Sequence, residues 1–354
     1  IGGEWYKNIL YREAEGLGIG LQWALLKVLL KTMGQRISCL WRRAITLENK
    51  TIIRVGKRIA EGGFSYVFIA TDQGGNTRAL KRVRIQSIEQ KTLAEHEMKV
   101  HRELTDRNNK YILPLLDYGF FTVRGIHELF LLYPFRKSSL RDEINQRVLS
   151  ERARPWSTNE LLQLFKGICL GIQELHIHNP SWAHRDLKPE NILISNEGIP
   201  QLMDFGSVTE ANVAVRTRKE ALTLQETAAQ YSTISYRAPE LFDVPSSADI
   251  DTRSDIWSIG CTFYAMLFGY SPYECEFSNR GGIRVVECTY LRVIGKIPEP
   301  PESSKYSKSS YDIALECLQI DVSQRPFIDT LLDTIDRTHN KHSTRASFSA
   351  STSI

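Results

Sequence analysis

Between residues 51 and 133, hydrophobic and polar residues alternate in several short stretches, as they do in half-buried strands. The alternating stretches predict five strands, and they lie at residues 51–59, 66–71, 78–83, 112–121 and 127–133. Between the third and fourth strands, residues 87–104 carry apolar side chains at helical spacing, which predicts one helix. We therefore expect a small antiparallel sheet with one helix in this part of the chain.

After residue 135 the pattern becomes helical. Residues 159–179 predict a long amphipathic helix, and residues 255–268 are apolar on almost every side, which is typical of a buried helix. From residue 338 the chain is rich in Ser, Thr, Lys and Arg without periodicity, so 338–354 is expected to be a disordered tail. The predicted fold class is α+β, with a small lobe at 51–135 and a larger, mostly helical lobe at 136–337.

The composition excludes several classes of protein. The 354 residues are 42% hydrophobic and 24% charged, as in ordinary globular proteins, and the length fits two domains or lobes. A net charge of +4 is too small to predict nucleic-acid binding, and no nucleic-acid partner is expected. The six cysteines include no C-x-x-C pair, which favours a reducing compartment. No apolar run reaches the roughly 18 residues that span a bilayer.

The stretch His-Arg-Asp-Leu-Lys-Pro-Glu-Asn at 184–191 places a base, a cation and a metal ligand close together. Asp186 can accept a hydroxyl proton, Lys188 can neutralise charge on a phosphoryl group in transfer, and Asn191 can bind Mg²⁺. A D-F-G triplet follows at 204–206 in the order found in protein kinases. A surface loop with ordinary charges would not produce this order of motifs, so we expect a two-lobed protein kinase fold.

Residues that could hold the triphosphate and its metal ion are also present. Lys81 lies on the third predicted strand, where kinases hold the α- and β-phosphates, and Asp204 is the expected ligand of the metal between the β- and γ-phosphates. Glu97 lies within the predicted helix and is expected to reach Lys81. Glu95 and Glu103 are the alternatives on the same helix, where most glutamates are solvated.

The expected ATP site combines a loop after the first strand, the third strand, the hinge between the lobes and the catalytic loop. Its residues are Ala60, Gly62, Gly63, Phe64, Ser65, Val67, Ala79, Lys81, Leu132, Tyr133, Pro134, Phe135 and Asn191. Ala60 and Ser65 replace two glycines of the usual G-x-G-x-x-G-x-V loop. Leu132 is the expected gatekeeper, and Pro134 removes one amide donor from the hinge. The expected cofactors are ATP and Mg²⁺, with Mn²⁺ as an alternative.

The acceptor side of the site predicts a serine/threonine kinase. Lys-Pro-Glu-Asn follows Asp186, where tyrosine kinases usually have arginine and alanine. Thr233 precedes an Ala-Pro-Glu triplet at 238–240 and is expected to hydrogen-bond Asp186 and Lys188. The segment before Thr233 is long, and its residues 220–230 are rich in helix formers, which favours a helix over a flexible loop.

The loop Glu-Gly-Gly-Phe-Ser-Tyr-Val at 61–67 resembles that of the Numb-associated kinase family. Further stretches resemble one member of that family that carries myristate and palmitate, and they lie at residues 33–34, 39, 221–225, 228–230 and 233–242. The resemblance implies a constitutively active serine/threonine kinase on the cytoplasmic face of Golgi and other secretory membranes, partly cytosolic. It also implies the helix inside the activation segment.

The N-terminal region predicts a membrane anchor if translation starts at Met33. Met-Gly-Gln-Arg-Ile-Ser then matches a myristoylation signal at Gly34, and Cys39 is a candidate for palmitoylation. Seven cations against one Glu between 34 and 58 would add attraction to anionic lipid, so 33–50 is the expected anchor. Residues 1–32 could be an interfacial helix, a signal-peptide core or an upstream extension of the gene, and the Met-Gly pattern could arise by chance.

Three functions remain to be distinguished. The first is an autophosphorylating kinase that modifies Ser and Thr hydroxyls of protein substrates. The second is a pseudokinase scaffold, against which the complete set Lys81, Asp186, Asn191 and Asp204 argues. The third is a membrane-tethered adaptor whose anchor matters more than its activity.

Overall fold

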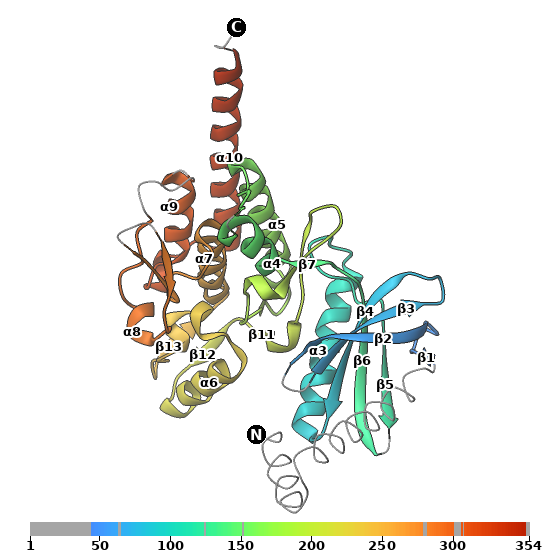
Figure 1. Ribbon diagram of the computed structural model, residues 1–354. Helices are drawn as coiled ribbons and strands as arrows, with labels where there is room; N and C mark the ends of the chain where they lie inside the picture. Colours follow the sequence, from blue (N-terminus) through green and yellow to red (C-terminus); the bar gives the residue numbers. More distant parts are fainter. Residues whose placement is uncertain are drawn as a thin grey trace, which may run out of the picture.

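Two lobes lie side by side in the computed structural model, which describes residues 44–62, 65–123, 125–150, 152–278, 282–300, 306 and 308–351 (Figure 1). The N-terminal lobe holds one antiparallel sheet in the order β1-β2-β3-β4-β6-β5. Its strands are β1 (Ile45–Thr46), β2 (Ile52–Glu61), β3 (Ser65–Asp72), β4 (Thr77–Ile85), β5 (Asp117–Val123) and β6 (Ile126–Pro134). Strand β1 lies inside residues 33–50, the predicted membrane anchor, so this end of the anchor segment pairs with the sheet.

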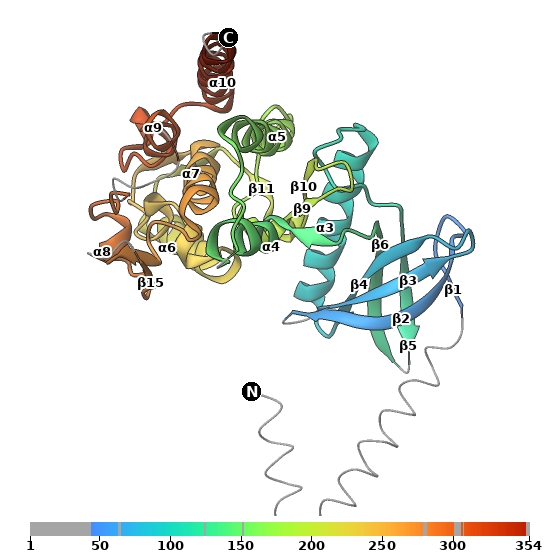
Figure 2. The same cartoon turned by 45° about the horizontal axis from the view of Figure 1, so that its top comes forward.

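Helix α3 (Ile88–Asp106) lies against the face of the sheet that is turned toward the C-terminal lobe (Figure 2). Ser87 caps its first turn by accepting a hydrogen bond from the backbone N–H of Gln90, which explains why the helix starts there. Ala94 and Met98 pack on the sheet, whereas Val100 and Leu104 join the core of the C-terminal lobe. Glu97 and His101 are also buried on this helix. The predicted strand at 112–121 starts later, at Asp117, because Leu113 instead donates its backbone N–H to Leu202 of the other lobe.

The C-terminal lobe is built around two buried helices. Helices α5 (Thr158–His176) and α7 (Arg253–Phe268) pack together, with the rings of Phe165 and Phe263 stacked at 3.9 Å. Ser157 and Glu160 form a capping box that fixes the start of α5. The other helices of this lobe are α4 (Leu140–Ile144), α6 (Arg218–Tyr231), α8 (Tyr290–Val293), α9 (Lys308–Cys317) and α10 (Ile328–Ser351). Among the described residues, none of the helices combines the length and hydropathy that a bilayer crossing requires.

Short strands position the catalytic segments between these helices. They are β7 (Ser138–Ser139), β8 (Trp182–Ala183), β9 (Ile192–Ile194), β10 (Pro200–Leu202), β11 (Thr209–Glu210), β12 (Val213–Val215), β13 (Ala248–Ile250), β14 (Cys275–Phe277) and β15 (Ile283–Val285). They pair as β10-β9-β7, β11-β8, β12-β13 and β14-β15. The pairs β10-β9 and β11-β8 surround the catalytic loop, and β12-β13 ties the segment before α6 to the main body of the lobe.

The C-terminal tail differs from the sequence-based expectation. Residues 338–351 continue α10 instead of being disordered, and the helix extends away from the body of the molecule (Figure 1). Its first turns are held on α5 by Lys166, which donates to Asp336 at 2.7 Å, and by Gln173, which donates to Asp329. No Gly or Pro follows to end the helix. The tail was predicted to be disordered because of its polar composition, but it continues a helix that packs on α5.

Candidate active site

Lys81 binds one carboxylate from each lobe. Its Nζ lies 2.6 Å from Oε1 of Glu97 on α3 and 2.8 Å from Oδ1 of Asp204 in the D-F-G triplet. Burial alone would lower the pKa of Lys81, but Asp204 and Glu97 together hold it well above its ordinary value. The same cation lowers the pKa of Asp204 to about 2, so that carboxylate is ionised at neutral pH. Of the three helix glutamates considered from sequence, Glu97 is the one that reaches Lys81.

Asp186, Lys188 and Thr233 form a closed hydrogen-bond triangle at the acceptor side of the cleft. Lys188 Nζ donates to Oδ2 of Asp186 at 2.7 Å and to Oγ1 of Thr233 at 2.6 Å. The hydroxyl and the backbone N–H of Thr233 both donate to Oδ1 of Asp186, at 2.7 and 2.8 Å. The contacts expected for Thr233 are therefore present, and they fix the orientation of the Asp186 carboxylate.

Asn191 and Asp204 supply the oxygens that could bind a divalent metal. The side-chain amide of Asn191 donates through Nδ2 to the backbone carbonyl of Asp186 at 2.9 Å, which leaves its Oδ1 as an acceptor for another group. Asp204 adopts the left-handed conformation, with φ 63°, and 41% of its side chain is exposed. An amide oxygen beside a partly exposed, ionised carboxylate is a donor set that suits Mg²⁺ or Mn²⁺.

The register of the sheet decides which residues face the nucleotide side of the cleft. Val67 pairs with Lys81 and Lys81 with Leu131, and Ala79 likewise pairs with Tyr133. Residues paired across strands point to the same face, so these side chains share the face of Lys81. Ala60 pairs with Val67, and Gly62 donates its N–H to the carbonyl of Ser65 at 2.8 Å. Gly63 and Phe64 lie outside the described residues.

Leu132 is not the gatekeeper. It pairs with Leu80 and is buried on the opposite face of the sheet, in a cluster with Ile53, Ala70 and Phe130. Tyr133 is the last residue of β6 whose side chain faces the cleft before the hinge continues through Pro134 and Phe135. The prediction was wrong by one residue, and a slip of one residue in a strand moves every side chain to the other face.

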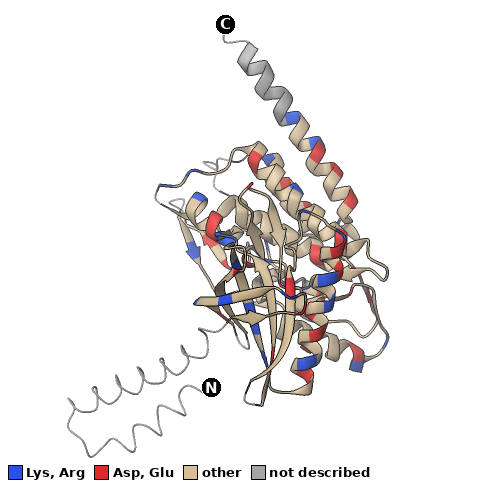
Figure 3. Ribbon diagram, turned by 90° about the vertical axis from the view of Figure 1, so that its right-hand side faces the viewer, with Lys and Arg blue, Asp and Glu red and all other residues tan. Residues whose placement is uncertain are grey.

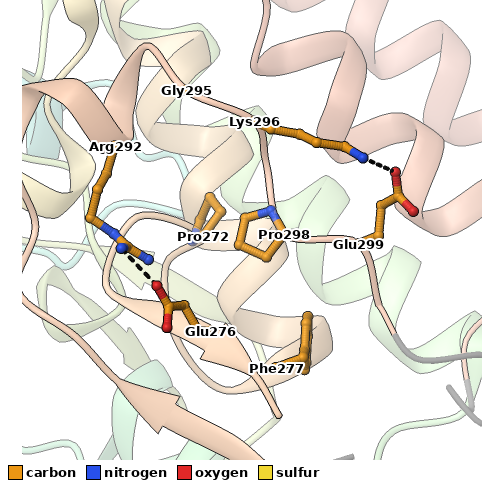
Figure 4. Close-up of a pocket in the computed structure, with 8 residues that line it drawn as sticks. All are labelled: Pro272, Glu276, Phe277, Arg292, Gly295, Lys296, Pro298 and Glu299. Atoms are coloured by element: carbon orange, nitrogen blue, oxygen red, sulfur yellow. Dashed lines mark hydrogen bonds and ion pairs between the residues drawn. The ribbon is translucent and has the colours of Figure 1, made fainter. Parts of the chain in front are cut away.

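A hollow of about 430 Å³ opens between the lobes beside these groups. It is lined by residues of β4, α3, the catalytic segments and the end of α6, and they include Glu97, Asp186, Asp204, Gly206 and Tyr231. A second hollow, of about 440 Å³, lies between β14 and α8 in the C-terminal lobe (Figure 4). Its charges are paired with one another, as Arg292 with Glu276 and Lys296 with Glu299. Of these two hollows, only the first is lined by the expected catalytic and metal-binding residues Glu97, Asp186 and Asp204.

The segment between the D-F-G triplet and Thr233 is held by Arg185 and by helix α6. Arg185 donates to the Ser254 hydroxyl at 2.6 Å and to the Ala211 carbonyl at 3.0 Å. Helix α6 starts at a capping box formed by Thr217 and Glu220, and its one fully buried side chain is Ala221. The helix predicted at 220–230 is therefore present, although sequence patterns alone gave no sign of the bonds from Arg185.

Two further polar groups in the site were missed from sequence. Asp255, at the start of α7, accepts the backbone N–H groups of His184 and Arg185 at 2.7 and 3.0 Å, which supports the catalytic loop from below. His101 on α3 hydrogen-bonds Tyr133 and touches Phe205. The spacing of His101, one helical turn after Glu97, was a usable signal for this second group.

Comparisons with known proteins agree with this geometry. Residues 53–334 match the family model for the protein kinase domain. The chain is 37% identical to serine/threonine-protein kinase 16 of Homo sapiens over 306 residues, which cover 86% of this chain and 95% of that protein. It is 26% identical over 339 residues to serine/threonine-protein kinase ENV7 of Saccharomyces cerevisiae, with 79% and 90% covered. The resemblance to one particular kinase that was noted from the sequence is to the first of these relatives.

Proposed function

The chain belongs to the protein kinase family and is a serine/threonine kinase, and we propose that it is a membrane-attached, autophosphorylating member that is active without an upstream kinase. The Numb-associated kinase family is the subfamily that we propose for it. The observation that carries the proposal is the joint presence of the Lys81–Glu97–Asp204 and Asp186–Lys188–Thr233 contacts.

The proposed reaction transfers the γ-phosphoryl group of ATP to a Ser or Thr hydroxyl. The acceptor oxygen bonds to the γ-phosphorus while the bond to the β,γ-bridging oxygen breaks, and ADP leaves. Asp186 orients the hydroxyl and takes its proton, Lys188 stabilises charge on the transferred group, and Lys81 orients the triphosphate. Asn191 and Asp204 would hold the divalent metal, which neutralises phosphate charge when bound; we propose Mg²⁺, with Mn²⁺ as the alternative.

Independence from an upstream kinase rests on how the activation segment is held. Two donors of Arg185 are engaged by Ser254 and Ala211, so internal groups satisfy a side chain that many kinases pair with a phosphate. Helix α6 and the pairing of β12 with β13 brace the same segment. We propose that these contacts replace activating phosphorylation.

Membrane attachment is proposed through acylation of Gly34 and Cys39, which lie outside the described residues. Among the described residues, Arg54, Lys57 and Arg58 are exposed on β2 and form a basic surface. Basic residues recur along the strands of the N-terminal lobe (Figure 3). Attraction of such a surface to anionic lipid, at about 1 kcal/mol per cation, would supplement the acyl chains. The Golgi and other secretory membranes remain the proposed location.

Transfer of labelled phosphate from ATP tests the proposed activity. The purified protein should label itself and an added protein on Ser or Thr, and chelation of divalent metal should stop both reactions. Tight ATP binding without any labelling would instead indicate a kinase-fold scaffold and would refute the proposed mechanism.

Membrane attachment is tested separately in cells. Protein started at Met33 should sediment with membranes, and Gly34→Ala should release it, because palmitate addition follows the transient docking that myristate provides. Cys39→Ser should leave weak, salt-sensitive binding. A wholly soluble Met33-started protein would refute the anchor and leave the kinase activity untouched.

A further inference from the structure

The turn between β1 and β2 is fixed to the body of the N-terminal lobe. Asp117 on β5 is 1% exposed and accepts the backbone N–H groups of Asn49 and Thr51, at 3.1 and 3.3 Å. Glu48 donates its own backbone N–H to the Tyr118 carbonyl at 2.9 Å. A buried carboxylate that is satisfied in this way holds the turn in one position. The start of the described chain is therefore a fixed part of the sheet instead of a free linker.

The connection from this part of the sheet to the proposed acyl chains is short. Cys39 and Ile45, the first residue of β1, are six positions apart in the sequence. A fully extended chain of that length spans at most about 22 Å. A palmitoyl chain on Cys39 would therefore keep the β1 end of the lobe close to the bilayer. So short a tether gives the nearby protein surface a high effective concentration at the lipid.

The surface at this end of the lobe is basic. Four cations are exposed between residues 44 and 58, and they are Lys50, Arg54, Lys57 and Arg58. Glu48 is the one exposed carboxylate in the same range. Arg58 pairs with Glu61 at 2.9 Å, whereas the other three cations have no ion-pair partner among the described residues. Cations without partners inside the protein are available to lipid phosphates.

An exposed isoleucine lies among these cations. The side chain of Ile52 is 44% exposed, although the neighbouring Ile53 is fully buried in the core of the lobe. Successive residues of a strand point to opposite faces, so Ile52 and Arg54 lie on the same face of β2. One exposed isoleucine is ordinary on a protein surface, but this one is flanked by unpaired cations beside the anchor segment. Apolar side chains flanked by cations suit the boundary between lipid headgroups and acyl chains.

We propose that the β1–β2 end of the N-terminal lobe, with Lys50, Ile52, Arg54 and Lys57, is a second membrane contact that lies on anionic lipid. Ile52 enters the headgroup region, and the three cations meet lipid phosphates. The proposal deepens the proposed membrane attachment and rests on it. In both Figure 1 and Figure 2, β1 lies on the side of the N-terminal lobe away from the C-terminal lobe. The contact therefore holds the acceptor side of the cleft away from the bilayer.

Binding of the unacylated protein to vesicles tests this contact without the anchor. The Met33-started chain with Gly34→Ala and Cys39→Ser is mixed with phosphatidylcholine vesicles that contain about one-third phosphatidylserine. It should sediment with these vesicles at low salt and not with phosphatidylcholine alone. Lys50→Gln combined with Arg54→Gln should weaken the binding about 25-fold, since each cation contributes about fivefold. The matched control, Arg152→Gln with Arg154→Gln, removes two exposed cations of the C-terminal lobe and should bind like the parent.

A fluorophore whose emission shifts in lipid tests the orientation. Attached at Ile52→Cys it should shift to shorter wavelength on the phosphatidylserine vesicles. At Ile320→Cys, which replaces a similarly exposed isoleucine of the C-terminal lobe, it should not shift. The cysteines of the described chain are buried, so the label goes to the introduced thiol.

Thermal unfolding shows that each variant is folded at the assay temperature. Absence of binding to phosphatidylserine vesicles, equal binding of the charge variant and the parent, or an unshifted label at position 52 of bound protein would overturn the proposal. These outcomes leave the acyl anchor intact. The anchor instead fails if the acylatable Met33-started protein stays soluble in cells.

Discussion

The two sides of the catalytic cleft are held in different ways. On the C-terminal side, the catalytic loop rests on Asp255, a fully buried carboxylate at the start of the apolar helix α7. On the N-terminal side, Lys81 and Glu97 depend on the position of α3, a single helix with buried polar contacts at His101. The C-terminal side is therefore held in place by a large core, whereas the N-terminal side is held by a few polar bonds. The difference suggests that conformational control of this enzyme resides in α3.

The largest effect is expected from Asp186→Asn on the C-terminal side of the cleft. The amide keeps the size of the side chain but cannot take the acceptor proton, so kcat should fall roughly 10³-fold while ATP binding persists. Steady-state kinetics and nucleotide-binding measurements check this. Asp243→Asn, the same substitution at an exposed position, is the control. Comparable turnover of parent and Asp186→Asn would show that another group performs this role.

Asp255→Asn should act on stability. Asp255 accepts bonds from two backbone N–H groups and from Nε2 of His176. Burial would raise its pKa, but interactions with His176, His184 and Arg185 keep the pKa low. An amide cannot accept all of these bonds, so the free energy of unfolding should fall by about 3 kcal/mol. Urea unfolding measures the change. A loss below about 0.5 kcal/mol, as at ordinary surface sites, would contradict the rigid support described for this side.

The α3 side should show its own pH dependence. The pKa of His101 is lowered from 6.5 to about 4. Between pH 6.5 and 4, the unfolded chain therefore binds a proton at this residue that the folded protein does not bind. Stability contributed by neutral His101 is complete above pH 6.5 and is lost as the pH falls toward 4, by up to about 3 kcal/mol. The Leu113 carbonyl and the titratable groups Lys81, Asp204 and Tyr133 surround it.

Urea unfolding at several pH values compares the parent with His101→Leu. The variant should lose less stability than the parent between pH 6.5 and 4, because it lacks the group that titrates. The exposed His127→Gln variant should follow the parent. Parallel curves for the parent and His101→Leu would show that His101 is not held neutral in the folded protein.

Local patterns predicted much of the fold. The strands around Lys81, the helices α5 and α7 and the helix inside the activation segment all carry a periodic signal over many residues. The catalytic motifs predicted which residues meet in the cleft, because their order along the chain is itself informative. Leu132 was misassigned because the hinge was placed by spacing along the chain instead of by strand register from Lys81.

The remaining features depend on contacts between distant segments. Arg141 on α4 donates to Glu190, to the Gly269 carbonyl and to the Tyr236 hydroxyl, three groups from separate parts of the chain. The pairing of His101 with Tyr133 spans 31 intervening residues in the same way. A single sequence carries no periodic signal for such bonds, and only the packed fold brings their partners together.

Activity after complete dephosphorylation shows most directly whether internal contacts hold this kinase in its active arrangement. The protein would be treated with phosphatase, checked by intact mass and mixed with ATP and a peptide that contains Ser or Thr. We expect phosphorylation of the peptide from the first time point, at the rate of untreated protein. A lag that shortens as the protein relabels itself, or complete loss of activity, would contradict it.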